Sequence, residues 1–482
     1  AAKWVGNHPN AELMQINSFG CGPDSITIDE AKEIIEQYGK FLHLIRVDEH
    51  SSSGSLKLRI RSLIESMKIK RNKTNNEEKN TKFIHKSRIT TPDFVKRDKK
   101  KTILLPYFSP FHSSYISGSF KAMGYNVEIL PPSKSTSLDL GLKYVNNEIC
   151  YPATIVIGDI LSAVSSGKYD LKNIAVGITQ TGGQCRASNY IPLLKKALIR
   201  AGYKDIPVVS ISISRKKLNY QPGFNFSKNK LTLMGVLGLF FGDAISEMYY
   251  SLMPRASRQG DVEKIAKKFS DLATKGVENF DLKYLLRQLQ NAVAEFNKIE
   301  INNLNPIKIG VVGEIFIKYN PFCNKYLLDY LIKKGVHINM PQLVNMFSQW
   351  LVNVHIKHNL NMENKLIAKK FAIFIEKYYN FVFKKFDNIM QDFRFYCPKH
   401  NLRELAEKAE KVVNLSSHYF GEGWLIAGDV ISYAESGIKK ILCLQPFGCI
   451  ANHIVARGAE KALKDLIPDL NILFLEDRKS VV

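Results

Sequence analysis

The chain has 482 residues, of which 45% are hydrophobic and 23% are charged, so it can form roughly two to four domains. Its seven cysteines, an odd number without a secretory signal, argue against a secreted disulfide framework. The longest apolar run, Leu231–Phe241, falls short of the roughly 18 residues that a membrane span needs, so we expect a cytoplasmic protein.

The first segment, residues 1–67, predicts a parallel α/β unit. Strands are expected at Leu13–Ile16 and Phe41–Val47, and helices at Asp29–Tyr38 and Ser55–Met67. Short apolar runs that alternate with amphipathic helices are typical of parallel sheets.

Residues 68–101 predict a basic linker rich in Lys and Asn. The stretch from Lys68 to Lys101 holds 13 Lys or Arg against 4 Asp or Glu and lacks helical or strand periodicity. The net charge of +23 could indicate nucleic-acid binding, which would predict aromatic residues interleaved with the basic ones. The only aromatic residues in this stretch are Phe83 and Phe94. A flexible, solvated linker is therefore the preferred interpretation.

Residues 102–225 predict a second wound α/β unit, and residues 226–304 predict amphipathic helices. The strands expected in this α/β unit are the apolar runs Ile103–Leu105, Val127–Leu130, Thr154–Ile157, Ile174–Ile178 and Val208–Ile213.

Residues 305–482 predict a further α/β unit, with a helical insert at residues 342–390. The expected elements are the strand Ile307–Val312, the helix Leu327–Lys334, the strand Val336–Ile338, an apolar stretch Lys411–Leu415, the helix Gly428–Ser436, and the strands Ile441–Gln445 and Ile472–Leu475. The predicted fold class is α/β, with Rossmann-like parallel-sheet subdomains and helical inserts.

The chain also repeats itself. Phe19-Gly20-Cys21 matches Phe447-Gly448-Cys449, and the strand after each helix matches too, Leu42–Asp48 with Asn471–Asp477. We therefore expect residues 1–67 to be the tail of an upstream copy of the unit that ends the chain, and both ends to be cut from a larger protein.

Two cysteines follow predicted strands on glycine-bearing turns. Cys185 lies after Gly182 and Gly183, and Cys449 lies directly after Gly448. Ligands gather at the carboxyl ends of strands in open α/β sheets, and glycine lets the backbone bring its N–H groups close to an inorganic ligand. Several thiolates that converge in this way usually hold an iron–sulfur cluster.

A third thiol, Cys150, precedes the predicted strand Thr154–Ile157, or lies on a helix N-terminus that reaches across the cleft. Spacing alone is weak support for a cluster, because no C-x-x-C pair occurs and a single thiol is more often structural. We assign that structural role to Cys323, Cys397 and Cys443.

Nucleotide-binding motifs are absent from the sequence. Ser166-Gly167-Lys168 lacks the upstream glycine of a P-loop, and Gly421-Glu422-Gly423 lacks the third glycine of a dinucleotide-binding turn. No hydrolase or metalloprotease motif occurs either, so no catalytic residue is assigned.

Six segments resemble a known family. They are Gln15–Asp24, Asn147–Pro152, Thr179–Tyr190, Gly313–Pro321, Ser417–Trp424 and Leu444–His453, and they span most of the chain outside the linker. The chain resembles the C-terminal part of the large activase-related proteins of the 2-hydroxyacyl-CoA dehydratase system, which are related to the double-cubane cluster proteins. TGGQCRASNY and QPFGC are the most specific blocks.

This resemblance implies two α/β subdomains with a cluster, of the [4Fe-4S] or double-cubane type, in the cleft between them. It assigns Cys150 and Cys185 to the first subdomain as ligands and Cys449 to the second. Cys21 is a further candidate, as the third ligand of the upstream copy or as a ligand to this one. The groups expected to surround or support the cluster are Gly182, Gly183, Arg186, Gly448, Gln180, Asn189, His418 and His453.

The chain departs from the family pattern at Cys323, where a small or apolar residue is expected, in its long linker, and in its end soon after Asp477-Arg478. None of these departures affects the three ligands.

The function predicted is ATP-driven, low-potential electron transfer. The resemblance implies a partner, an ATP-hydrolysing activator of the actin-like fold, and no membrane. The first alternative is a dehydratase-type lyase acting on a 2-hydroxyacyl-CoA. The second is a basic α/β protein that binds nucleic acid, which the composition of the linker disfavours.

Overall fold

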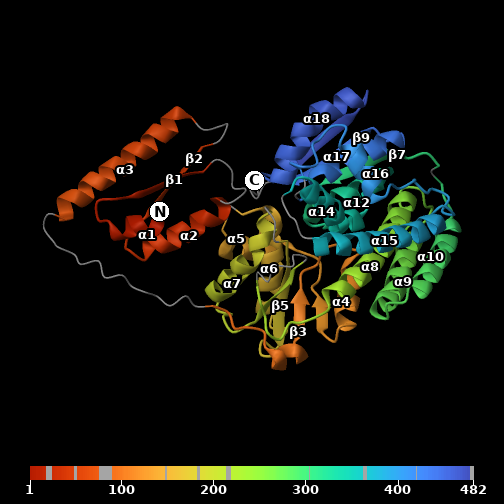
Figure 1. Ribbon diagram of the computed structural model, residues 1–482, viewed down its shortest axis with the longest axis horizontal. Coiled ribbons are helices and arrows are strands. Elements are labelled where there is room, and N and C mark those ends of the chain that lie inside the picture. The colour runs from red at the N-terminus through yellow and green to blue at the C-terminus, as the bar shows by residue number, and fades with distance from the viewer. Residues whose placement is uncertain are drawn as a thin grey trace.

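The computed structural model describes residues 1–17, 24–47, 52–74, 90–146, 149–181, 185–212, 219–302, 304–361, 366–418 and 421–477. Within these ranges, every named strand belongs to one of three parallel sheets, and helices cover the sheets (Figure 1). The predicted α/β class is thus confirmed.

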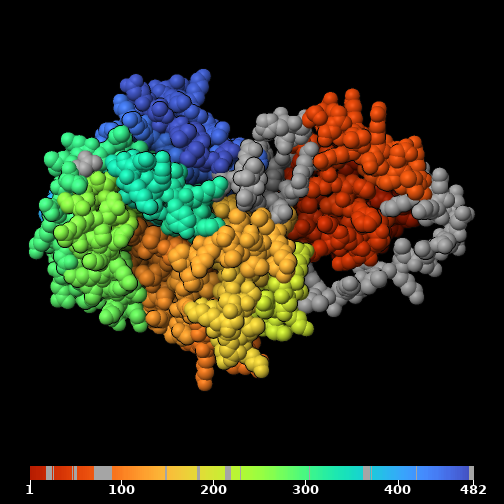
Figure 2. All heavy atoms as spheres, turned by 180° about the vertical axis from the view of Figure 1, so that it is seen from behind, coloured from red at the N-terminus to blue at the C-terminus, as the bar shows by residue number. Residues whose placement is uncertain are grey.

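The N-terminal unit contains one parallel β-α-β motif. Its elements are α1 (Ala2–Asn7), β1 (Leu13–Asn17), α2 (Asp24–Glu36), β2 (Leu42–Arg46) and α3 (Ser53–Thr74). It lies to one side of the main body (Figures 1 and 2). Lys196 of the main body contacts Glu30 and Glu33 of α2, at 2.8 and 3.0 Å.

The first subdomain contains a four-stranded sheet in the order β4-β3-β5-β6. Its elements are η1 (Lys96–Lys100), β3 (Thr102–Leu105), α4 (Ser113–Lys121), β4 (Asn126–Ile129), α5 (Ser135–Tyr144), α6 (Tyr151–Ser165), β5 (Ile174–Gln180), η2 (Arg186–Asn189), α7 (Tyr190–Arg200) and β6 (Val208–Ser212).

Three helices follow, α8 (Lys228–Leu252), α9 (Gln259–Glu278) and α10 (Leu282–Asn297). Residues 229–252 of α8 are long and apolar enough to cross a membrane, so the apolar element is longer than the sequence run suggested. However, 61% of its most apolar stretch is buried inside the molecule. The helix contacts α9, α10, α15 and β8, which is the environment of a core helix.

The second subdomain contains a sheet in the order β10-β9-β7-β8. Its elements are β7 (Ile307–Gly313), α11 (Ile315–Tyr319), α12 (Leu327–Lys333), β8 (Val336–Asn339), α13 (Leu343–Ser348), α14 (Trp350–Asn359), α15 (Leu366–Met390), α16 (Leu402–Ala409), α17 (Gly423–Glu435), β9 (Lys440–Pro446), the π-helix η3 (Ile450–Ile454), α18 (Val455–Leu466) and β10 (Asn471–Asp477).

The two larger sheets share one topology. When the strands of each are numbered along the chain, both have the order second, first, third, fourth. The strand order reverses between β3 and β5 in one sheet and between β7 and β9 in the other. Ligands bind at the carboxyl ends of strands beside such switch points, which makes these four strand ends the places to search for a site.

Two predicted elements are wrong. Thr154–Ile157 lies inside the helix α6, whose residues 151–161 are all buried. A short run that is apolar on all sides does not distinguish a buried strand from a buried helix, and Pro152 in the first helical turn favours the helix. Lys411–Leu415 forms turns after α16.

The predicted linker is also only partly correct. Helix α3 continues to Thr74, and residues 75–89 lie outside the described residues. From residue 90 onward the chain belongs to the first subdomain, because Phe94 is fully buried in a core with Ile103 and Phe120. The charge composition of residues 68–101 does not reveal that an apolar side chain, Phe94, attaches the end of this stretch to the core.

A buried histidine makes the stability depend on pH. His337 on β8 is hydrogen-bonded to Ser251 of α8, at 3.0 Å, and burial lowers its pKa to about 3. Between roughly pH 6.5 and 3 the unfolded chain binds a proton that the native protein does not, so stability must fall as the pH falls.

We measure the free energy of unfolding with urea at several pH values between 6.5 and 3. We expect it to fall less steeply with decreasing pH in His337→Gln than in the wild type, by at most about 1.4 kcal/mol per pH unit. His8 has its ring hydrogen-bonded to the Trp4 carbonyl near the exposed N-terminus, so His8→Gln is the control. Equal slopes for wild type and His337→Gln would contradict the assignment.

Candidate functional site

The three predicted cysteine ligands share one structural position, the N-cap of a helix. Cys150 caps α6, Cys185 caps η2, and Cys449 caps the π-helix η3. Free N–H groups and the positive end of the peptide dipoles lie at such ends, and both favour a thiolate. Each cysteine occupies the N-cap position, but none of the three side chains accepts a capping hydrogen bond from its own helix.

The three thiols lie near enough to influence one another. Although Cys185 is exposed as a residue, protein surrounds its sulfur, and this burial raises the pKa of the thiol to about 12, with a further increase from Cys150. Burial also raises the pKa of Cys449 well above its usual value, and Cys185 is among the charges that add to this effect. The structure therefore brings together three thiols that the sequence separates.

Cys150 has one close partner. Its Sγ lies 2.9 Å from the hydroxyl of Tyr190, at the start of α7. Burial raises the pKa of Tyr190 well above its usual value, and the thiols of Cys150 and Cys185 raise it further. Tyr190 is therefore a neutral hydrogen-bonding group beside two of the thiols.

Two carboxyl groups lie beside the thiols, with Glu422 buried and Glu314 half-buried. Glu314 caps α11, and Glu422 caps α17. Burial, followed by the charge of Glu422, raises the pKa of Glu314 to about 8. Both carboxylates also raise the pKa values of Cys185 and Cys449, which shows that they face the same region.

A hydrogen-bond chain connects one carboxylate to one thiol. Asn452, which is fully buried, donates from Nδ2 to Glu422 Oε2 at 3.0 Å and to Cys449 Sγ at 3.4 Å. Glu422 Oε1 accepts the Ile315 N–H at 2.7 Å. These two bonds fix the side chain of Glu422 between the N-terminus of α11 and the helix η3.

The topology of the second sheet explains this convergence. Glu314 directly follows β7, and Cys449 follows β9, so both lie at the switch point of the sheet. The Glu314 N–H donates to the Leu444 carbonyl at 2.8 Å. Gly313 has a φ of 117°, and a Cβ there would lie 2.0 Å from the same carbonyl oxygen, so only glycine lets β7 end this close to β9.

Other predicted residues support the loops that carry the thiols. Arg186 is buried, and its Nη2 donates to the Gly448 carbonyl at 3.4 Å, which links the loop of Cys185 to that of Cys449. Gln180 donates to the Ser188 carbonyl at 2.7 Å and so stabilises η2.

Two further predicted residues have structural partners, whereas Asn189 occupies the N-cap position of α7 without a side-chain capping hydrogen bond. The ring of His418 is hydrogen-bonded to the Asn414 carbonyl at 2.7 Å, and His453 pairs with Glu476 at 3.1 Å. The predicted candidates Cys21, Gly182 and Gly183 lie outside the described residues.

The remaining thiols differ in burial. Cys323 and Cys443 are fully buried, and Cys397 is half-buried with its backbone N–H bonded to Glu247. None of them caps a helix.

A single metal ion does not fit the site. Within the described ranges, no three His, Cys, Asp or Glu side chains are close enough to share one ion. In a cubane cluster each thiolate binds a different iron atom, so its ligands are spaced more widely than those of one ion. The spacing of the three thiols therefore leaves the predicted iron–sulfur cluster as a proposal.

No protein-family model matches this chain. A search of curated proteins likewise finds no match. The family resemblance therefore stays a prediction from the quoted motifs.

The sequence analysis did not assign roles to four residues of this site, Tyr190, Glu314, Glu422 and Asn452. All four lie within the motifs that carry the resemblance, each near a ligand cysteine or at a glycine-bearing turn. The sequence signal available for Glu314 and Glu422 was an acidic residue next to a glycine at the end of a predicted strand or in a turn. Such carboxyl groups are rarely buried without a role.

Proposed function

We propose that this protein holds an iron–sulfur cluster on Cys150, Cys185 and Cys449 and uses it for low-potential electron transfer. The observation that carries the proposal is that the three thiols each occupy the N-cap of a helix, with Cys185 in electrostatic range of both Cys150 and Cys449. Chance arrangement of structural thiols gives no reason for this shared position.

The residues around the thiols would have distinct tasks. Asn452 donates a hydrogen bond to the sulfur of Cys449, which would stabilise a thiolate there against its raised pKa. Tyr190 covers Cys150, and Arg186 holds the loops of Cys185 and Cys449 together across the two subdomains. A bound cluster would supply the one-electron chemistry.

The proposed electron donor is an ATP-hydrolysing activator of the actin-like fold, as the sequence resemblance implies, and the proposed location is the cytoplasm. Cys185 is exposed as a residue although protein surrounds its sulfur, so the proposed donor would approach the outside of this loop rather than the sulfur itself.

Anaerobic reconstitution of the full chain with iron and sulfide tests the proposal. We expect a brown protein with about four iron atoms per chain and, after reduction, an electron paramagnetic resonance spectrum of a cubane. A chain that remains colourless and free of iron under these conditions would overturn the proposal.

A further inference from the structure

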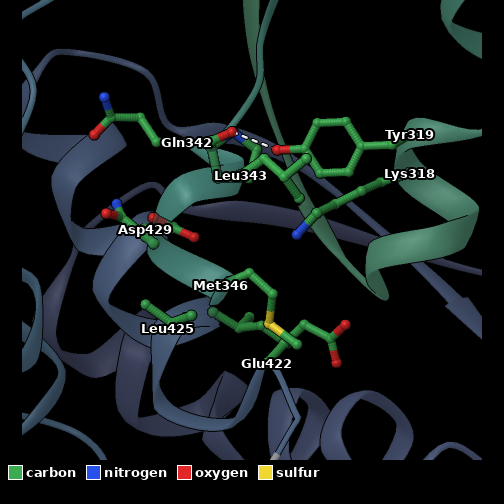
Figure 3. A pocket seen from close by; sticks show the side chains of 11 residues that line it. Lys318, Tyr319, Gln342, Leu343, Met346, Glu422, Leu425 and Asp429 are labelled. Carbon is green, nitrogen blue, oxygen red and sulfur yellow. Dashed lines mark hydrogen bonds between the residues drawn. The ribbon is translucent and has the colours of Figure 1, made fainter. Parts of the chain in front are cut away.

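Two small cavities share a lining residue, the first within the second subdomain and the second between that subdomain and helix α8. The first is lined by Lys318, Asn345, Glu422 and Asp429 together with apolar neighbours (Figure 3). The second is lined by a separate set of polar groups, Asp243, Glu247, Asp387, Tyr396 and Lys399. Gln342 lines both, and each leaves room for about one water molecule.

These cavities are polar enough to hold water. In the first, the Lys318 amine donates to the Gly313 carbonyl at 3.0 Å. The Tyr319 hydroxyl donates to the Pro341 carbonyl at 2.5 Å (Figure 3). In the second, Glu247 pairs with Lys399 at 3.4 Å. A water molecule in either space would find several hydrogen-bonding partners, as buried waters require.

One cavity begins near the surface and the other ends beside the thiols. Asp387, Tyr396 and Lys399 are each half-buried, so the second cavity lies near solvent. At the opposite end, Glu422 lines the first cavity and is bonded to Asn452, which contacts Cys449. The two cavities, which share Gln342, thus lie between these half-buried residues and Glu422.

We propose that these two cavities form a proton path from the surface at Tyr396 and Lys399, through Gln342 and Asp429, to Glu422 beside the thiols. Its purpose rests on the proposed cluster, since each electron added to a buried site is best balanced by a proton. Each transfer moves one proton along hydrogen bonds between water and side chains. No electron moves, and no bond between heavy atoms forms or breaks.

Asp429 is the central group of this path. Burial raises its pKa to about 7, and the charges of Lys318 and Lys399 oppose that shift. The other titratable groups that face it are Tyr319 and Tyr433, both of which its charge affects. A carboxyl group that titrates near neutral pH can both accept and release a proton, as a relay requires.

Infrared spectroscopy of the metal-free full chain tests the path. At pH 5 the Asp429 carboxyl band, identified as the one that Asp429→Asn removes, should shift within the mixing time after transfer into D₂O. Gln342→Leu, which blocks the shared position, should slow this exchange at least tenfold. Asp159 is a matched control: it is buried with a pKa raised to about 6, but it contacts Ser133 rather than either cavity, so its band should exchange slowly.

Two outcomes would overturn the proposal. One is exchange at Asp429 as slow as that at Asp159, and the other is an exchange rate that Gln342→Leu leaves unchanged. If that variant fails to fold, a high-resolution crystal structure decides, because both cavities must contain ordered water. All of these measurements use metal-free protein, so a chain that binds no iron would overturn the proposed function without affecting this test.

Discussion

Replacement of Cys185 or Cys449 by serine should remove most of the iron that the reconstituted protein binds, from about four atoms per chain to one or fewer. The reason is geometric. These two thiols occupy helix N-caps on opposite subdomains, and Arg186 ties their loops together, so no other described thiol can replace either. The readouts are iron content and the spectrum of the reduced protein.

Cys443→Ser is the matched control for this prediction. Cys443 lies on the same strand, β9, that leads to Cys449, but its side chain is fully buried in the core. We expect this variant to keep wild-type iron content. Iron lost equally from the Cys443 and Cys449 variants would show that the effect is loss of folding rather than loss of a ligand.

The second large effect is expected for Gly158→Ala in helix α6. A Cβ at this position would lie 1.8 Å from the Ser137 carbonyl of α5, and one at Gly141 would lie 2.1 Å from the Thr154 carbonyl of α6. The two helices therefore press backbone against backbone. Neither backbone can move apart without disturbing the core. We therefore expect the free energy of unfolding, measured with urea, to fall by about 3 kcal/mol, the upper end for an overpacked core.

This substitution should also weaken iron binding, because Cys150 caps the helix that must move. Gly235→Ala in helix α8 is the control, since nothing lies within 4 Å of a Cβ at that position. For Gly235→Ala we expect the free energy of unfolding to rise by about 0.5–1 kcal/mol, because alanine has the better helix propensity. If Gly158→Ala were as stable as Gly235→Ala, the close packing of α5 and α6 would be wrong.

Much of the α/β pattern could be predicted because strand and helix periodicities differ. The strands β3, β5, β7 and β9 coincide with apolar runs that the sequence shows directly. Helix α6 could not be recognised, because it is buried on nearly all sides and so has no polar face to reveal its period. Burial of that kind depends on α5 and α7, which lie elsewhere in the chain.

The candidate site shows the same division. The glycine turns before Cys185 and Cys449 were visible as motifs, and the position of Cys150 was left open between a strand and a helix N-terminus. Glu314 and Glu422 could not be connected with the thiols, because they come together only where β7 meets β9 and α17 begins. Local patterns identify such residues, but only tertiary packing gives them a common environment.

The shared strand order of the two sheets also bears on how the protein is made. In the second sheet, residues 314–439 separate the paired strands β7 and β9, whereas in the first sheet only residues 106–173 separate the paired strands β3 and β5. Pairing across a long separation is slow, so we expect the first subdomain to fold during synthesis and the second to complete its sheet only after β9 has emerged. Cys150 and Cys185 would then be in place while Cys449 is still unplaced. Insertion of the proposed cluster would then have to wait for the last strands, so metal loading would be a late step that reports on completed folding.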